Sequence, residues 1–225
     1  MVGGLKALNV RQATVSYFQQ HFANVEWERP TLVGVEFPRL SDDCNSILIA
    51  PFTMEEIEGV VRECKGSKCP GPDGFNFAFI KEFWDLMKFD IRIFFDQFHG
   101  IDSLPSCLLS YFLTLIPKVN SPHKLTDFWP ISLIGCWYKL LSKVLARRLT
   151  MVIGKLIPKT QLAFLKGRQL VEGVVVVNEV IDFAKKAGKE CMIFKVDFEK
   201  AYDSVDWGFL DYMFGRFGYC AKWLG

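Results

Sequence analysis

The stretch "KVDFEKAYDSVDW", Lys195–Trp207, follows directly on the apolar run "CMIF", Cys191–Phe194. A strand through Ile193–Val196 would bury at least one face, and Asp197 would stand at its C-terminal end, where a side chain can leave the core for a cleft. Carboxylates at strand ends bind Mg²⁺, which takes oxygen ligands and keeps waters for a phosphate substrate. A two-metal phosphoryl-transfer site would need further acidic ligands from elsewhere in the fold.

The other two aspartates of this stretch favour structural roles. Asp206 immediately precedes the helical pattern "WGFLDYMFGRFG" and is therefore predicted to be the N-cap of that helix. For Asp203 we expect a local turn or a salt bridge. The residues alone leave Asp197 open between a metal ligand and a structural carboxylate. An EF-hand is excluded because the required order of acidic residues and glycine is absent.

Composition indicates a folded intracellular protein. Half of the 225 residues are hydrophobic and 15% are aromatic, which is ample for a core. The seven cysteines include no C-x-x-C pair, so reduced, mostly buried thiols are expected rather than a disulfide framework. The N-terminus does not resemble a signal peptide, and no apolar stretch approaches the ~20 residues of a membrane helix. No membrane partner is therefore expected.

Basic residues are concentrated in one region. Residues 117–168 hold ten Lys or Arg and one acid, Asp127, although the whole chain has a net charge of only +2. Lys139, Lys143 and Arg147 are spaced four apart in "YKLLSKVLARRLT", which places them in a row on one helix face. Such a block indicates a polyanionic partner or, alternatively, a solvated face with counter-charges.

Periodicity predicts the other elements. Thr53 and Glu56 at capping-box spacing start a helix, and residues 75–99 read as one long helix with core-facing Phe79, Ile80, Phe83, Leu86 and Met87. We expect strands at "YFLTLIPKV", "ISLIG" and "KECMIFKVDF", a helix over residues 138–150, and a helix that ends at Gly188. The order favours an α+β fold.

These segments together resemble the reverse transcriptases of LINE-type (non-LTR) retrotransposons. The resemblance rests on "GPDGFNFAFIKEFW", "LTLIPKV", "FWPISLIGCWYKLLSKVLARRL", "QLAFLKGRQLVEGVVVVNEVIDF" and "FKVDFEKAYDSVDWGFLDYM" in the family's order. It implies a right-handed polymerase, of which this chain would hold a lead-in and connector, residues 1–45, and a partial reverse transcriptase domain, residues 46–225. That domain would comprise the fingers and an incomplete palm, without the thumb.

The resemblance also implies roles for single residues. Asp197 matches the first catalytic metal ligand, and Phe198 sits where a backbone carbonyl helps to hold the metal. Tyr202 matches the aromatic that excludes a 2′-hydroxyl and so selects deoxynucleotides. Lys118 matches a fingers lysine that contacts the nucleotide. Gly167 and Arg168 match a "GR" that approaches the template, and the row of Lys139, Lys143 and Arg147 would lie beside the nucleic acid.

Three departures from the family pattern are visible. Trp129 replaces the usual arginine of the "F-R-P-I-S-L" block and supplies no charge, and Lys166 replaces a proline before "GR". The second catalytic motif, an aromatic residue followed shortly by Asp-Asp, is absent, because the only adjacent aspartates, Asp42 and Asp43, lie in an expected N-terminal loop. We therefore expect the chain alone to be inactive as a polymerase.

The implied function is RNA-directed DNA polymerisation with Mg²⁺, or alternatively Mn²⁺, as the cofactor. The implied partners are an RNA template, a DNA primer, deoxynucleoside triphosphates and the rest of a polyprotein, which would carry the remaining palm, the thumb and in some relatives an endonuclease. The expected location is intracellular, with the nucleus favoured over the cytoplasm. The alternative is a nonenzymatic RNA-binding protein or a decayed copy of the element.

Overall fold

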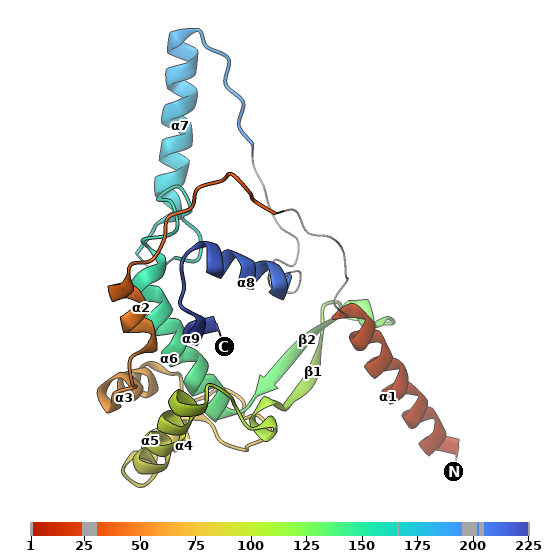
Figure 1. Ribbon diagram of the computed structural model, residues 1–225. Helices are drawn as coiled ribbons and strands as arrows, with labels where there is room; N and C mark the ends of the chain where they lie inside the picture. The colour runs from red at the N-terminus through yellow and green to blue at the C-terminus, as the bar shows by residue number, and fades with distance from the viewer. Residues whose placement is uncertain (1, 24–30, 166, 195–201, 203–204, 225) are drawn as a thin grey trace. The chain divides into compact units, whose positions relative to one another are not determined.

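The computed structural model describes residues 2–23, 31–165, 167–194, 202 and 205–224. The chain forms two compact units, which are described separately (Figure 1). The first unit comprises residues 1–31 and 51–144, and the second comprises residues 32–50 and 145–225. Helices dominate both units, and the described strands form one antiparallel pair, so the predicted α+β class is confirmed. The expected boundary at residues 45–46 stays a prediction.

The first unit starts with α1, Val2–His21, and continues with three helices after residue 50: α3, Met54–Glu63; α4, Phe77–Glu82; and α5, Trp84–Ile101. Thr53 caps α3 by accepting the backbone N–H of Glu56 at 3.2 Å, as its spacing predicts. The core on these helices includes Ile57, Val60, Ile80, Ile91 and Phe95, each at most 4% exposed.

The long helix predicted over residues 75–99 is wrong in two respects: it is broken at Phe83, and Phe79, Phe83 and Leu86, which were expected to face the core, are each at least 40% exposed. Phe83 leaves the helical conformation, with φ −101° and ψ 26°, and so divides α4 from α5. Periodicity cannot detect this break, because the apolar spacing continues through it. As a consequence Leu86 is 75% exposed, while Ile91 and Phe95 are the buried residues of α5.

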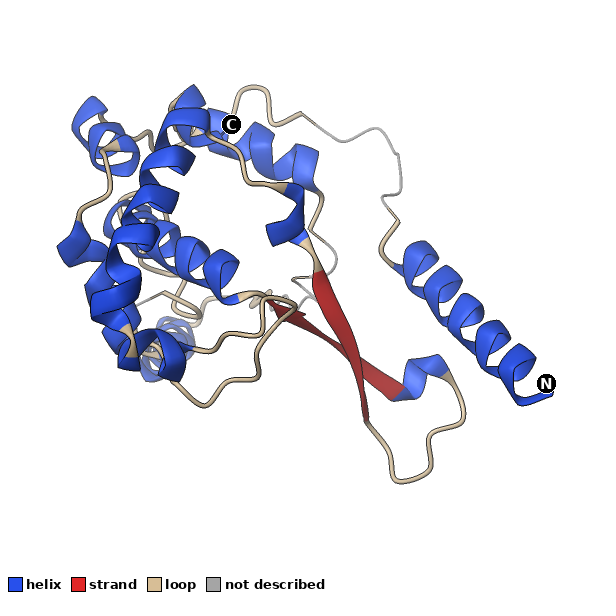
Figure 2. Cartoon of the chain, turned by 90° about the horizontal axis from the view of Figure 1, so that it is seen from below, coloured by secondary structure: helices blue, strands red, loops and turns tan. Residues whose placement is uncertain are grey.

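Two strands follow α5 and a short 3₁₀ turn, Ser106–Leu109. Strand β1, Tyr111–Pro117, pairs antiparallel with β2, Phe128–Ile134, and the 3₁₀ turn Leu125–Asp127 lies in the connecting loop (Figure 2). Ile116 stands opposite Trp129 in the register. Since directly opposed residues share a face, Phe112, Ile116, Trp129 and Ile131 lie on one side of the pair, and Tyr111 lies on the other.

The loop "CPGPDG", residues 69–74, is attached to the first turn of α6, Cys136–Ile153. The Asp73 carboxylate accepts the backbone N–H groups of Cys136 and, at 3.4 Å, Trp137, and also that of Phe75 at 3.3 Å. A Cβ on Gly135 would lie 2.8 Å from Asp73 Oδ2, so the close approach requires glycine there. Asp73 therefore caps α6 from 63 residues earlier in the chain.

The second unit packs α2, Asp42–Ile49, with the second half of α6 and with residues from the C-terminal region. Its core cluster consists of Leu40, Cys44, Leu48, Val152, Leu156 and Tyr219. The predicted loop around Asp42 and Asp43 is wrong, because both residues form the first turn of α2, where carboxylates interact favourably with the helix dipole.

Polar contacts tie these segments together within the second unit. The Arg148 guanidinium, 3% exposed, donates to the carbonyls of Leu48, at 2.9 Å, and Ala50 at the end of α2. The Asn45 amide donates to Gly218 O at 2.8 Å and accepts from Cys220 N at 2.9 Å. The Lys155 ammonium lies 3.0 Å from Cys44 Sγ, which lowers the pKa of that thiol.

Three further helices complete the second unit: α7, Leu170–Ala187; α8, Trp207–Arg216; and α9, Ala221–Leu224. Helix α7 ends at Gly188, with φ 59°, as predicted. The strand predicted through residues 189–198 is absent from its described part, residues 189–194, where Phe194 is 84% exposed. A strand needs a hydrogen-bonded partner, and the described residues offer none there. No described helix is long and apolar enough to span a membrane.

Candidate nucleic-acid interface

The end of the β1–β2 pair brings a lysine and a tryptophan together. Lys118 follows β1 directly, and its Nζ lies 4.2 Å from the centroid of the Trp129 ring. The same ammonium donates to the carbonyl of Thr126 at 2.9 Å, and the Lys118 backbone N–H donates to Asp127 O at 2.7 Å. The side chain of Lys118 is thus held over the ring by two contacts.

Asp127, the single acid of the basic region, accepts hydrogen bonds from the backbone of its own loop. Both His123 and Lys124 donate their backbone N–H to Asp127 Oδ2, at 2.9 and 3.0 Å. The hydrogen bond from His123, followed by that from Lys124, lowers the pKa of the Asp127 carboxyl. The carboxylate is therefore occupied with fixing the loop, and Lys118 and Lys124 are both exposed around it.

The three basic residues predicted to form a row on α6 differ in exposure and in contacts. Lys143 and Arg147 are exposed, whereas Lys139 is half-buried and donates its ammonium to Cys69 O at 3.2 Å. The stripe on the opposite side is buried as predicted, with Leu140, Leu141 and Val144 at most 2% exposed. Nucleic-acid contact by this row stays a prediction.

The "GR" pair stabilises the turn before α7. Gly167 has φ +83°, a conformation that favours glycine, and it directly precedes Arg168. The Arg168 guanidinium donates to the backbone carbonyls of Ile157, at 2.9 Å, Pro158 and Gln161. These donors hold the loop that precedes α7, and a template contact by Arg168 stays a prediction.

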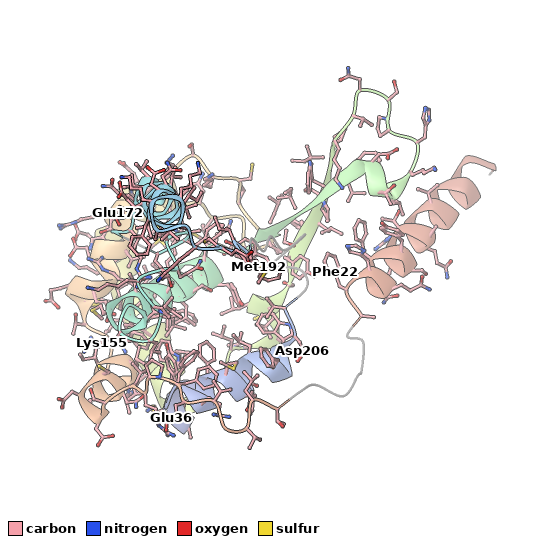
Figure 3. The ribbon with its side chains drawn as sticks, turned by 90° about the horizontal axis from the view of Figure 1, so that it is seen from above. Phe22, Glu36, Lys155, Glu172, Met192 and Asp206 are labelled. Atoms are coloured by element: carbon pink, nitrogen blue, oxygen red, sulfur yellow. The ribbon has the colours of Figure 1, made fainter. Side chains whose placement is uncertain are left out.

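Of the catalytic stretch, the structure describes Tyr202 and residues from Val205 onward. Tyr202 is 79% exposed, and its ring lies 6.2 Å, edge to face, from that of Phe164. Asp206 Oδ1 accepts the backbone N–H of Phe209 at 2.7 Å at the start of α8, so its predicted role as N-cap is confirmed (Figure 3). Asp197, Phe198 and Asp203 lie outside the described residues.

Within the part of the chain that the structure describes, no three His, Cys, Asp or Glu side chains come together as metal ligands. The predicted ligand Asp197 is not among them, so these residues provide no test of a metal site. The predicted roles of Asp197 and of the Phe198 carbonyl stay predictions.

Comparison with known proteins shows which family the chain is similar to. Residues 116–224, which include β2, α6, α7 and α8, match the family "Reverse transcriptase (RNA-dependent DNA polymerase)". The "Transposon TX1 uncharacterized 149 kDa protein" of Xenopus laevis is 28% identical over 173 residues, 77% of this chain and 13% of that protein.

Two further relatives agree. The "Probable RNA-directed DNA polymerase from transposon BS" of Drosophila melanogaster is 25% identical over 200 residues, 88% of this chain and 21% of that protein. The "Retrovirus-related Pol polyprotein from type-1 retrotransposable element R1" of Bradysia coprophila is 24% identical over 199 residues, 78% of this chain and 18% of that protein. These matches support the resemblance to the reverse transcriptases of LINE-type (non-LTR) retrotransposons that the motifs indicate.

The matches to this chain span between 13% and 21% of the length of these relatives. The matched region contains Lys118, Trp129, the α6 row and the catalytic stretch in one continuous segment. The matches support the resemblance that the motifs indicate. Reverse transcriptases generally use divalent metal ions.

Two features of the candidate interface were not predicted from the sequence. The contact of Lys118 with Trp129 depends on the strand register, which places Trp129 opposite Ile116, two residues before Lys118. The capping of α6 by Asp73 joins two of the family blocks, "GPDG" and "FWPISLIGCW", and their order along the chain does not show that they touch. No local signal in the sequence shows either contact, because the partners lie on different strands or, for Asp73 and Cys136, 63 residues apart.

Proposed function

We propose that this chain supplies the fingers and the first part of the palm of an RNA-directed DNA polymerase. The reverse transcriptase match over residues 116–224 carries the proposal, because it includes Asp197, Phe198 and Tyr202 in the expected order. In this proposal residues 1–45 form a lead-in, residues 46–225 form the partial domain, and the polymerase has the right-handed fold of its family. The partners are an RNA template, a DNA primer and deoxynucleoside triphosphates.

The proposed chemistry is two-metal nucleotidyl transfer with Mg²⁺, or Mn²⁺ in its place. Bound metal would activate the primer 3′-hydroxyl and stabilise the pyrophosphate that leaves. Asp197 and the carbonyl of Phe198 would hold the metal, Tyr202 would exclude a ribose, and Lys118 would contact the nucleotide phosphates. The proposed site of action is the nucleus, which a fluorescent fusion and microscopy would test.

We also propose that residues 1–225 alone do not polymerise. No aromatic-x-Asp-Asp motif occurs in the sequence, and its only adjacent aspartates form the first turn of α2. Primer extension on an RNA template with Mg²⁺ tests this, with Asp197→Asn as the control. We expect no product from either protein, and synthesis that disappears in D197N would overturn the proposal.

One observation favours a second function, nonenzymatic RNA binding. Trp129 stands where the family pattern has an arginine, and the Lys118 ammonium is already engaged by the Trp129 ring and Thr126 O. Less positive charge is therefore available to bind a nucleoside triphosphate at this position. Exposed basic residues nevertheless remain on the hairpin loop and α6. A filter-binding titration against salt tests this function, since contacts with phosphates make the affinity fall steeply with salt.

A further inference from the structure

The face of the hairpin that carries Trp129 is exposed and apolar. The residues that line it are Phe112, Ile116, Trp129 and Ile131, which are between 42% and 57% exposed. They come from both strands, and Ile116 lies directly opposite Trp129, which is 55% exposed, while Phe112 lies toward the other end of β1. One flat aromatic surface is thus presented near the end of a small two-stranded sheet, next to a lysine.

Lys118 covers only one side of that ring. Its Nζ is 4.2 Å from the ring centroid and is fixed by the Thr126 carbonyl at 2.9 Å. An ammonium has three N–H donors, so a donor remains for a further acceptor beside the ring. Because the cation already restrains the indole, a ligand that stacks on the other ring face would have less side-chain entropy to remove.

The charge around the hairpin indicates which kind of ligand fits. Lys118 and Lys124 are exposed on the hairpin, and its single acid, Asp127, is bound to the backbone N–H groups of its own loop. A polyanion is therefore favoured over an apolar protein surface. Exposed aromatics beside basic residues on a sheet are the arrangement on which bases of single-stranded RNA stack.

We propose that Trp129 is a base-stacking residue for single-stranded RNA. A nucleobase stacks on the ring face opposite Lys118, and the free donor of Lys118 contacts a phosphate of the same strand. This inference rests on the proposed function, since it requires that the fingers bind nucleic acid. It also gives the substitution at this position a chemical meaning, because an aromatic surface for a base replaces a charge for a phosphate.

Fluorescence anisotropy with a labelled single-stranded RNA of about twelve nucleotides, titrated at several salt concentrations, tests the proposal. Trp129→Ala should weaken binding by about 5- to 150-fold, the range for loss of one stacked base, and leave the salt dependence unchanged. Trp129→Phe should retain most of the affinity. Lys118→Met should reduce the slope of log affinity against log salt by about 0.7 to 1.

The matched control is Tyr111→Ala. Tyr111 is 56% exposed on the same hairpin, but it lies on the opposite face. The Tyr111→Ala variant should bind RNA like the wild-type chain, and circular dichroism should show the same fold for all variants. Equal losses in Y111A and W129A would assign the effect to the hairpin as a whole and overturn the proposal.

The remaining outcomes separate this inference from the proposed function. RNA binding by the wild-type chain that W129A does not weaken overturns the stacking role and leaves nucleic-acid binding intact. Absence of any RNA binding by the wild-type chain overturns both. Photocrosslinking identifies the source of the base: RNA containing 5-iodouridine should crosslink to Trp129, whereas a crosslink from the iodinated deoxyuridine triphosphate alone would overturn the assignment to RNA.

Discussion

The carboxylate of Asp73 accepts the backbone N–H of Cys136, the first residue of α6, across 63 residues of sequence. It also accepts the N–H of Trp137 and that of Phe75, which follows in its own loop. One side chain therefore satisfies donors at a helix start that have no partner inside the helix. The same helix carries the basic row, so the position of that row depends on the loop.

Replacing Asp73 should destabilise the first unit. We expect Asp73→Ala to lower the free energy of unfolding by about 1–2 kcal/mol, the cost of a lost N-cap, and Asp73→Asn to cost less, because its amide oxygen still accepts. Urea denaturation followed by circular dichroism measures the change. Asp85→Ala is the control, since its ion pair with Lys88 involves a side chain that is 89% exposed, and it should cost under about 1 kcal/mol.

A side chain at Gly135 should conflict with the same carboxylate. A Cβ there would lie 2.8 Å from Asp73 Oδ2, so Gly135→Ala should cost about 1–3 kcal/mol of the free energy of unfolding. In the Asp73→Ala background the clash is removed, and the cost should fall by at least about 0.5 kcal/mol. Additive costs in this double-mutant cycle would contradict the contact.

Gly100→Ala provides the comparison for the glycine prediction. A Cβ at Gly100 would meet no atom within 4 Å, and the residue lies in α5. Alanine forms helices better than glycine, so this variant should be more stable by up to about 1 kcal/mol. The two substitutions should therefore change the midpoint of urea denaturation in opposite directions.

Neighbouring arginines on α6 should have separable effects. Arg148 is buried and donates to Leu48 O and Ala50 O, so Arg148→Ala should lower the free energy of unfolding by about 3 kcal/mol. Arg148→Lys should recover only part of this, because it lacks the planar fork. Arg147 is exposed, and Arg147→Ala should cost far less stability while reducing the salt dependence of RNA binding. Similar stability losses for R147A and R148A would contradict this division.

Tyr219 should limit stability at alkaline pH. Its hydroxyl is buried and has no hydrogen-bond partner among the described residues, and burial raises its pKa from 10.0 to about 12. Between these values the unfolded chain releases the proton first, so the free energy of unfolding falls as the pH rises from 10 to 12. Tyr219→Phe should lack this contribution to the fall, while that of the buried Cys136 thiol, whose pKa is raised to about 12, remains. It should gain about 1 kcal/mol at neutral pH, because no buried hydroxyl is left unsatisfied.

The control for Tyr219 is a tyrosine whose hydroxyl is used. The Tyr212 hydroxyl accepts from Leu32 N at 3.0 Å and from the Arg216 guanidinium at 2.7 Å. Tyr212→Phe should therefore lose about 1 kcal/mol at neutral pH, the opposite sign from Tyr219→Phe. Equilibrium urea denaturation of both variants from pH 7 to pH 12 measures the two effects, and a loss in Y219F would show that its hydroxyl has a partner.

The sequence correctly predicted the helix ends that depend only on neighbouring residues. The caps Thr53 and Asp206 accept N–H groups three residues ahead, and Gly188 ends α7 at its own backbone angle, so spacing and residue type were sufficient. The break at Phe83 was missed because its apolar neighbours continue the helical period. The strand expected over residues 189–198 failed in its described part because a strand depends on a partner elsewhere in the chain.

The candidate site was predictable in its composition but not in its contacts. The family blocks identified Lys118, Arg168 and the α6 row from the sequence. Lys118 over the Trp129 ring, Lys139 on Cys69 O and Arg168 on three carbonyls all require knowledge of which loops and strands are adjacent. A motif specifies which side chains are present, and tertiary packing decides which of their donors are already engaged.

The contacts of Asp73, Arg148 and Arg168 described above share one property: their partners are backbone atoms. A backbone carbonyl or N–H is present whatever side chain its residue carries. The residues that supply these partners can therefore be substituted without removing the bond, as long as the local backbone path is kept and the new residue is not proline at a donor position. We therefore expect each of these bonds to be lost when the residue that makes it with its side chain is replaced. Replacement of the residue that supplies the backbone atom should be tolerated.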